Sequence, residues 1–189
     1  ELDGLLGSRP EDTIPPRILG HCGNVLALLG RNEDAIACYT KLLAREPDSI
    51  PALLRLASLE IDTGDWQSAN AHLRLLLTHD PDHPGGLYTM GRLLHRVGEL
   101  DQAESCYRRA AEIDPRQVQV WNNLGNLYKE RERWDEAAQC YEQALALDPD
   151  RPVLRHLLAA MRGHDLATAD PEYVRSLFDG YAPRFDEDL

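Results

Sequence analysis

The sequence is poor in aromatic residues, and it lacks the long apolar runs that mark membrane proteins. Only 6% of its 189 residues are Phe, Trp or Tyr, and both phenylalanines, Phe178 and Phe185, lie in the last seventeen residues. No run of about 18 apolar residues occurs, so no membrane-spanning helix is predicted. The start of the chain has no signal-peptide pattern of basic and apolar residues. We therefore expect a cytoplasmic protein.

Short catalytic and metal-binding motifs are also missing. The sequence contains no Gly-x-Gly-x-x-Gly after a strand, no phosphate-binding loop, no His-Glu-x-x-His and no Cys-x-x-Cys. The net charge of −12 argues against nucleic acid as the main partner, because phosphate binding needs a basic surface. We expect a globular chain without catalytic residues, a metal site or a cofactor site of its own.

What the sequence does contain is an internal repeat. Four blocks of equal length align without a gap, at residues 16–49, 50–83, 84–117 and 118–151. One column is always alanine, and other columns hold a small residue, a leucine or tyrosine, and a proline. These columns are Ala35, Ala69, Ala103 and Ala137; Gly23, Ala57, Gly91 and Gly125; Tyr39, Leu73, Tyr107 and Tyr141; and Pro47, Pro81, Pro115 and Pro149.

Each block predicts two antiparallel helices. Apolar residues recur at intervals of three, four or seven positions in two separate stripes, and a breaker such as Gly64 stands between the stripes. The small columns have a mechanical reason, because only Gly or Ala lets two helix backbones approach closely. We expect an aspartate near the start of each second helix to act as its N-cap. These aspartates are Asp34, Asp65, Asp101 and Asp135.

The pattern resembles the tetratricopeptide repeat, a helix–turn–helix unit of the same length. The fourth block, WNNLGNLYKERERWDEAAQCYEQALALDP, matches nearly every column of its signature. The resemblance covers residues 16–151 and implies an all-α fold, a right-handed α-solenoid of four repeats. Two departures, Glu60 in an apolar column and Glu132 in place of the turn glycine, are expected to weaken single contacts. Residues 152–163 are predicted to form a C-terminal capping helix, and residues 1–15 an N-terminal arm.

Three of the four cysteines, Cys38, Cys106 and Cys140, share one column of the repeat. Residues that share a column of a solenoid are separated by the thickness of a repeat, which is too far for a zinc site or a disulfide. We expect the cysteines to be buried, reduced thiols that pack as small apolar side chains.

The resemblance also implies a concave face, lined by the first helix of each repeat, on which peptides bind. The family's six groove columns are those of Arg17, Gly20, His21, Asn24, Ala27 and Leu28 in the first block. Their 24 positions in the four blocks hold five basic and two acidic residues, although the whole chain carries −12. We predict that they bind a protein or peptide with acidic character, while a merely solvated helix face remains the alternative. Gly20 and Leu54 replace residues that a chaperone-type carboxylate clamp needs. The candidate groove residues are Asn24, Arg55, Tyr88, Arg92, His95, Arg96, Asn122, Asn123, Asn126 and Lys129.

The ending, DPEYVRSLFDGYAPRFDEDL, resembles the beginning of a different kind of domain. In a bacterial family, these repeats precede an S-adenosylmethionine-dependent methyltransferase, and a similar segment marks where the enzyme begins. The resemblance implies that residues 164–189 are a linker and the start of a downstream methyltransferase-like domain, with S-adenosylmethionine bound only by the full-length protein. The matching residues are Tyr173, Val174, Arg175, Leu177, Phe178, Asp179, Tyr181, Ala182, Arg184, Phe185 and Asp186.

Three functions therefore stay open. The first is the substrate-recruiting region of a methyltransferase. The second is a stand-alone scaffold or adaptor with no enzyme in the same chain. The third is the repeat arm of a glycosyltransferase, because Asn123 within the stretch NNLGN resembles the inner-face asparagine of the repeats found in such enzymes. The coding sequence beyond Leu189 would distinguish them.

Overall fold

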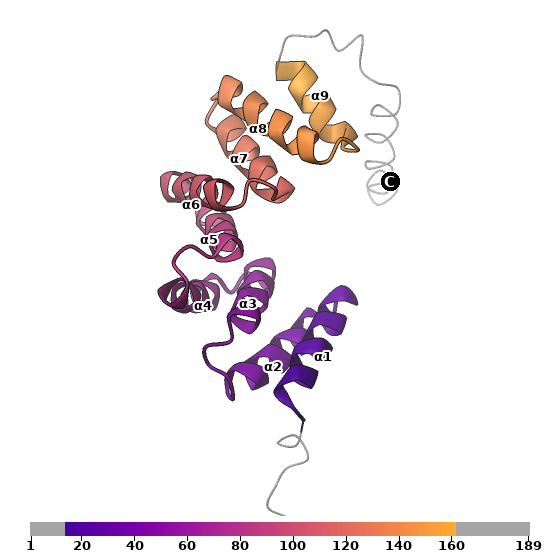
Figure 1. Cartoon of the computed structure of the whole chain (residues 1–189), viewed down its shortest axis with the longest axis vertical. Helices are drawn as coiled ribbons and strands as arrows, with labels where there is room; N and C mark the ends of the chain where they lie inside the picture. Colours follow the sequence, from indigo (N-terminus) through magenta and orange to yellow (C-terminus); the bar gives the residue numbers. More distant parts are fainter. Residues whose placement is uncertain (1–13, 162–189) are drawn as a thin grey trace, which may run out of the picture. The chain divides into compact units, whose positions relative to one another are not determined.

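The structure, a computed structural model, describes residues 14–161, with side chains up to Leu158 (Figure 1). Within this range it contains nine α-helices and no strand, which confirms the predicted all-α fold. The predicted arm before Ile14 and the predicted linker at residues 164–189 lie outside the described residues. The helices are α1 (Pro16–Leu28), α2 (Asn32–Leu43), α3 (Ile50–Thr63), α4 (Trp66–His79), α5 (Pro84–Arg96), α6 (Leu100–Ile113), α7 (Val118–Glu130), α8 (Trp134–Leu147) and α9 (Pro152–Met161).

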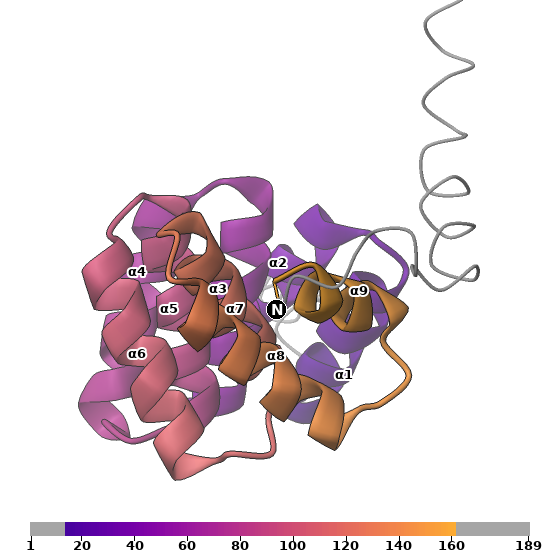
Figure 2. The same cartoon turned by 90° about the horizontal axis from the view of Figure 1, so that it is seen from above.

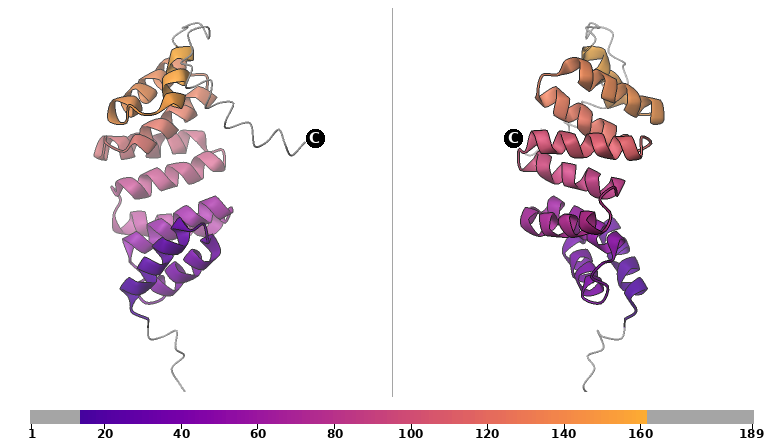
Figure 3. Two further views of the ribbon diagram at one scale, coloured as in Figure 1. Left: turned by 90° about the vertical axis from the view of Figure 1, so that its right-hand side faces the viewer. Right: turned by 60° about the vertical axis from the view of Figure 1, so that its left-hand side comes forward.

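The helices form hairpins, and three of the hairpins contact the helix that follows them. Helix α1 pairs with α2, α3 with α4, and α7 with α8, while α2 contacts α3, α4 contacts α5, and α8 contacts α9. The same hairpins are seen from other directions in Figures 2 and 3. The contacts divide the chain into two compact units, one up to Cys106 and one from Tyr107, with the boundary inside α6. The first unit also has a contact between two first helices, α3 and α5.

The turn between the two helices of a hairpin needs a residue in the left-handed region. Gly64 takes this position after α3 with φ +88°, and Gly30 and Gly98 do so in the neighbouring repeats. Glycine adopts such angles without the steric penalty that a β-carbon brings. Glu132, which replaces the glycine in the fourth repeat, has φ +58°. The turn therefore keeps its left-handed backbone, and Glu132 pays the steric penalty of a β-carbon in this region.

The predicted aspartate caps are only partly right. Asp65 caps α4 by accepting a hydrogen bond from the backbone N–H of Ser68 at 3.2 Å. Asp34 and Asp135 do not cap, because α2 and α8 begin after Arg31 and Arg133, and neither of these residues makes a side-chain cap. Instead, each arginine pairs with an acidic residue three positions later, so the acidic side chains lie in the first turn, where the helix dipole favours them. The pairs are Arg31 with Asp34 at 2.6 Å and Arg133 with Glu136 at 2.9 Å.

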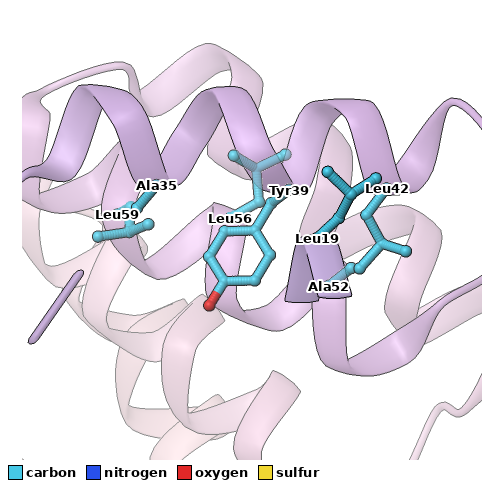
Figure 4. Packing of buried hydrophobic residues seen from close by; sticks show 7 residues of the cluster. All are labelled: Leu19, Ala35, Tyr39, Leu42, Ala52, Leu56 and Leu59. Atoms are coloured by element: carbon cyan, nitrogen blue, oxygen red, sulfur yellow. The ribbon is translucent and has the colours of Figure 1, made fainter. Parts of the chain in front are cut away.

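The alanine and small columns form the closest helix crossings. All four residues of the alanine column have no exposed surface. A β-carbon added at Gly23 would lie 2.7 Å from Cζ of Tyr39, so the tyrosine ring fills the space that the glycine leaves. The seven residues of the surrounding cluster, which joins the first hairpin to α3, are shown in Figure 4. They are Leu19, Ala35, Tyr39, Leu42, Ala52, Leu56 and Leu59.

Glu60 was expected to weaken a contact, but the structure provides a partner for it. Its side chain is buried, and its Oε2 lies 2.9 Å from Nδ1 of the half-buried His72 on α4. This hydrogen bond raises the pKa of His72 above its usual value, although burial acts in the opposite direction. Glu60 departs from the repeat pattern on α3, and a second departure, His72 on α4, therefore compensates for it.

The expectation of buried thiols holds for one cysteine and is wrong for another. Cys140 is buried, Cys38 and Cys106 are half-buried, and Cys22 is exposed. Burial raises the pKa of both half-buried thiols. Cys22 is exposed because its face of α1 has no helix packed against it among the described residues.

Candidate functional site

The first unit contains a pocket on the face that the repeat pattern assigned to ligand binding. Its volume is about 360 Å³, and it lies between α1, α2 and α3. Five of its seven lining residues stand in the predicted groove columns, and two of them, Asn24 and Arg55, are among the candidate site residues. The lining residues are Asn24, Ala27 and Leu28 of α1, Tyr39 of α2, and Arg55, Ser58 and Leu59 of α3.

Arg55 brings a positive charge to this pocket. Its side chain is exposed and makes no hydrogen bond or ion pair with another residue in the described part of the chain. A guanidinium in this state keeps all its donors available, and its planar fork fits a carboxylate. The pocket also has apolar walls, from Ala27 and from Leu28, whose side chain is 88% exposed. The site therefore combines apolar surface with a cation that has no partner among the described residues.

Asn24 has a structural partner, which limits what it offers a ligand. The buried Tyr39 hydroxyl donates a hydrogen bond of 2.8 Å to Oδ1 of Asn24. Burial raises the pKa of Tyr39, while the nearby Arg55 acts to lower it, so the phenol remains a protonated donor at neutral pH. Because Oδ1 is occupied, the Nδ2 amide is the group of Asn24 that remains to donate toward the pocket.

Arg92 was predicted to bind ligand, but the structure shows it engaged with α3. It donates to Oγ of Ser58 at 3.0 Å and to Oδ1 of Asp62 at 2.6 Å. The arginine side chain is only 23% exposed, and its charge is balanced by the aspartate. Arg92 therefore links α5 to α3, the first helices of two neighbouring repeats. On α5, the exposed Arg96 presents a positive charge to a ligand.

The remaining candidates are divided between the two units. Tyr88 and His95 are half-buried on α5, and both make interactions within the protein. In the second unit, four candidates are half-buried on α7. Of these, Asn126 accepts a hydrogen bond of 2.8 Å from the Tyr141 hydroxyl. The four are Asn122, Asn123, Asn126 and Lys129.

The pair Tyr141–Asn126 repeats the pair Tyr39–Asn24 in the same two columns. Burial, together with Cys140 and Glu130, raises the pKa of Tyr141 to about 12. Sequence reasoning assigned the tyrosines to packing and the asparagines to ligand binding, and it missed that the two are joined. The sequence did contain a signal for this bond, because asparagine and tyrosine are 15 residues apart in both pairs.

The described residues contain no cluster of three or more His, Cys, Asp or Glu side chains that is suited to a metal ion. None of the helices within residues 14–161 is both long and apolar enough to cross a bilayer. The cytoplasmic location expected from the sequence stays a prediction.

The hairpins and their repeating columns define a tetratricopeptide-repeat protein. The chain matches the family model of the C-terminal domain of cilia and flagella-associated protein 70 over residues 8–176, and it belongs to that family. No curated protein is similar enough in sequence to match the chain.

Solved structures of other repeat proteins are similar in fold. One is TTC0263, a thermophilic TPR protein of Thermus thermophilus, with 24% identity, a TM-score of 0.71, and 93% of this chain and 94% of that chain covered. Another is PilF of Pseudomonas aeruginosa, with 20% identity, a TM-score of 0.72, and coverages of 89% and 75%. MamA of Desulfovibrio magneticus has 19% identity, a TM-score of 0.68, and coverages of 87% and 93%. At these identities the similarity shows the fold alone.

Proposed function

We propose that the chain is a protein-interaction module that holds an acidic peptide or protein segment on the face of its first helices. The observation that carries the proposal is that Arg55, which has no partner among residues 14–161, lines the pocket between α1, α2 and α3 in a chain whose net charge is −12. A pocket of about 360 Å³ accommodates a side chain or a chain end rather than a folded partner.

Four of the seven residues that line the pocket have a role in this proposal. Arg55 forms a bidentate ion pair with a ligand carboxylate, and the Nδ2 amide of Asn24 donates a second hydrogen bond. Leu28 and Ala27 cover an apolar part of the ligand. The acidic remainder of the surface repels an acidic ligand that approaches elsewhere, so charge contributes to orientation as well as to affinity.

The proposal is tested by reversing the charge at the pocket and at a matched position. The probes are fluorescein-labelled decapeptides composed of Glu, Asp and Leu, compared with peptides in which Gln and Asn replace the acids. Fluorescence anisotropy should show preferential binding of the acidic set, which weakens as salt is raised from about 50 to 300 mM. Arg55→Glu should weaken binding by about tenfold or more, in line with the loss of a charged hydrogen bond.

Arg74→Glu provides the control, because Arg74 is exposed on α4, the second helix of its repeat, and does not line the pocket. It changes the net charge by the same amount and should leave the affinity nearly unchanged. Equal losses in the two variants would show that net charge, and not the pocket, determines binding. Equal binding of acidic and neutral peptides would contradict the acidic ligand.

The enzymatic setting is a second proposal and depends on the ending of the sequence. Residues 173–189 resemble the start of a methyltransferase domain, and they lie outside the described residues. We propose that the chain recruits the substrate of such an enzyme, with S-adenosylmethionine bound only when the sequence continues beyond Leu189. Calorimetry should give titration heat for the extended protein and none for the 189-residue chain. No heat from either would favour the stand-alone adaptor, and a glycosyltransferase arm would instead give heat with a nucleotide sugar.

A further inference from the structure

The pocket between α1, α2 and α3 is lined by a serine, Ser58, whose hydroxyl differs from five others on the helices. Each of those five donates a hydrogen bond to the backbone carbonyl four residues earlier in its own helix, which satisfies the hydroxyl proton locally. The hydroxyl of Ser58 donates to no group among residues 14–161. The five other residues are Thr40, Thr63, Thr78, Thr89 and Ser105.

Arg92 of α5 fixes the position of this serine oxygen. One end of its guanidinium donates to Oγ of Ser58 at 3.0 Å, and the other donates to Oδ1 of Asp62 at 2.6 Å. Ser58 and Asp62 are one helical turn apart on α3, so the two bonds hold the arginine across that turn. A hydroxyl has one donor and two acceptor lone pairs, and a serine that accepts from Arg92 therefore keeps its proton for another partner.

The polar side chains around the pocket consequently offer donors to a ligand. Oδ1 of Asn24 already accepts from the Tyr39 hydroxyl, so the Nδ2 amide of Asn24 is its group for a ligand. Arg55 makes no hydrogen bond or ion pair with the described residues, and Ser58 retains its hydroxyl proton. None of the seven residues that line the pocket is acidic. A ligand group that only accepts hydrogen bonds, such as a carboxylate, fits this set.

We propose that Ser58 donates a hydrogen bond to the ligand carboxylate and that Arg92 is the residue that positions it, an inference that rests on the proposed function of this pocket. Arg55 supplies the charge, while Ser58 and Asn24 supply neutral donors. Together they select a carboxylate over an amide of the same size, because the NH2 group of the amide meets donors. The charge of Arg92 is balanced by Asp62, so Arg92 acts through Ser58 and not by attracting the ligand.

The first test removes the hydroxyl. The probes are the acidic and neutral decapeptides of the preceding subsection, and the readouts are the affinity for the acidic set and the ratio of the two affinities. Ser58→Ala should weaken binding of the acidic set about tenfold and lower the ratio, because a hydrogen bond to a charged group is lost. The salt dependence should stay unchanged, since the lost donor carries no charge, whereas Arg55→Glu should reduce it.

Ser105→Ala is the matched control for this substitution. Ser105 is exposed on α6, does not line the pocket, and donates to the carbonyl of Asp101. Its replacement should leave both affinities within about twofold of the original, because no donor toward the ligand is removed. A loss equal to that of Ser58→Ala would overturn the assignment of Ser58 as a ligand donor.

The second test asks whether Arg92 acts through Ser58. Arg92→Met together with Asp62→Asn removes the positioning pair and leaves the net charge unchanged. This pair of changes should weaken binding of the acidic set roughly threefold to fivefold when Ser58 is present. When Ser58→Ala is also present, it should have less than a twofold further effect, because the residue through which Arg92 acts is gone. Equal losses in the two backgrounds would overturn the positioning role.

Failure of this inference can be distinguished from failure of the proposed function. If Ser58→Ala binds the acidic set as tightly as the original chain while Arg55→Glu does not, the pocket holds a carboxylate without Ser58, and the inference is wrong. If the unaltered chain binds acidic and neutral peptides equally, the proposed function is wrong and the inference falls with it. A tenfold loss in Ser58→Ala with an unchanged salt dependence supports both.

Discussion

The hairpins α1–α2 and α3–α4 make the same close crossing with different side chains. In the first, Gly23 lies under the ring of Tyr39, at a distance that leaves no room for a β-carbon. In the second, the same columns hold Ala57 and Leu73, and both are fully buried. The α7–α8 hairpin repeats the glycine–tyrosine solution. The small and the large residue therefore change together, so that their combined volume fits a constant crossing.

The difference extends from the core to the predicted binding face. Next to the crossing glycine stands Asn24, which accepts a hydrogen bond from the tyrosine hydroxyl. Leucine has no hydroxyl, and in α3 the same column holds Ser58, which accepts from Arg92 instead. In these two hairpins, the residue on the second helix and the hydrogen-bond partner of the first helix therefore differ together.

The largest effect is expected in the column that all the hairpins share. Ala103 has no exposed surface, and Ala103→Arg should lower the free energy of unfolding by about 4 kcal/mol, since it adds both bulk and an unpaired charge to the core. Ala71→Arg is the control, because Ala71 is exposed on α4. Urea unfolding compares the two. If the two variants are equally stable, the alanine column is not a close crossing.

The next prediction replaces the glycine–tyrosine pair of α7–α8 with the alanine–leucine pair of α3–α4. Gly125→Ala places a methyl group 2.6 Å from Cε1 of Tyr141 and should cost about 3 kcal/mol, because the ring must move within a packed core. Adding Tyr141→Leu recreates the pair found in α3–α4 and should recover most of this loss.

A double-mutant cycle measures the coupling between the two positions. The coupling should be large, because the two side chains occupy the same space. If the losses of the two single variants simply add, the columns are independent and the comparison fails.

Elements that recur in three or four repeats could be predicted from the sequence, and single exceptions could not. The helices, the turn glycines and the alanine column were visible because each repeat confirms the others. The pair of Glu60 and His72 was missed, although His72 stands in the column of the three recurring cysteines and both exceptions fall in one repeat. The groove columns were visible too, but the bond of Arg92 to Asp62 depends on how side chains are oriented across repeats.

The Glu60–His72 pair should make the α3–α4 hairpin sensitive to pH. His72→Ala leaves a buried carboxylate without its partner and should cost about 2 kcal/mol, less than for a fully buried pair because His72 is partly exposed. The pKa of His72 is raised in the folded state, so its contribution is complete below the unfolded value of about 6.5 and is lost as the pH rises through the folded value.

The matched control restores the apolar pair of the other repeats with Glu60→Leu and His72→Cys together. This double variant should be as stable as the original or slightly more stable, because an apolar pair carries no desolvation cost. It should also lose the decrease in stability that the original chain shows as the pH rises above about 6.5. Urea unfolding across this pH range compares the variants, and an unchanged slope in the double variant would show that His72 is not its source.

The smallest effect is expected at the turn, where the fourth repeat differs from the first three. Glu132 holds a left-handed backbone at φ +58°, which costs a residue with a β-carbon about 1–2 kcal/mol. Glu132→Gly removes this cost but gives the unfolded chain more freedom, so a net gain of about 0.5–1 kcal/mol is expected.

Gly98→Ala tests the same energy in reverse. A β-carbon there meets no atom within 4 Å, so only its φ of +85° opposes the change, and a loss of about 1 kcal/mol should follow. Urea unfolding should show changes of opposite sign, and a loss of stability in Glu132→Gly would mean that the glutamate side chain stabilises the turn.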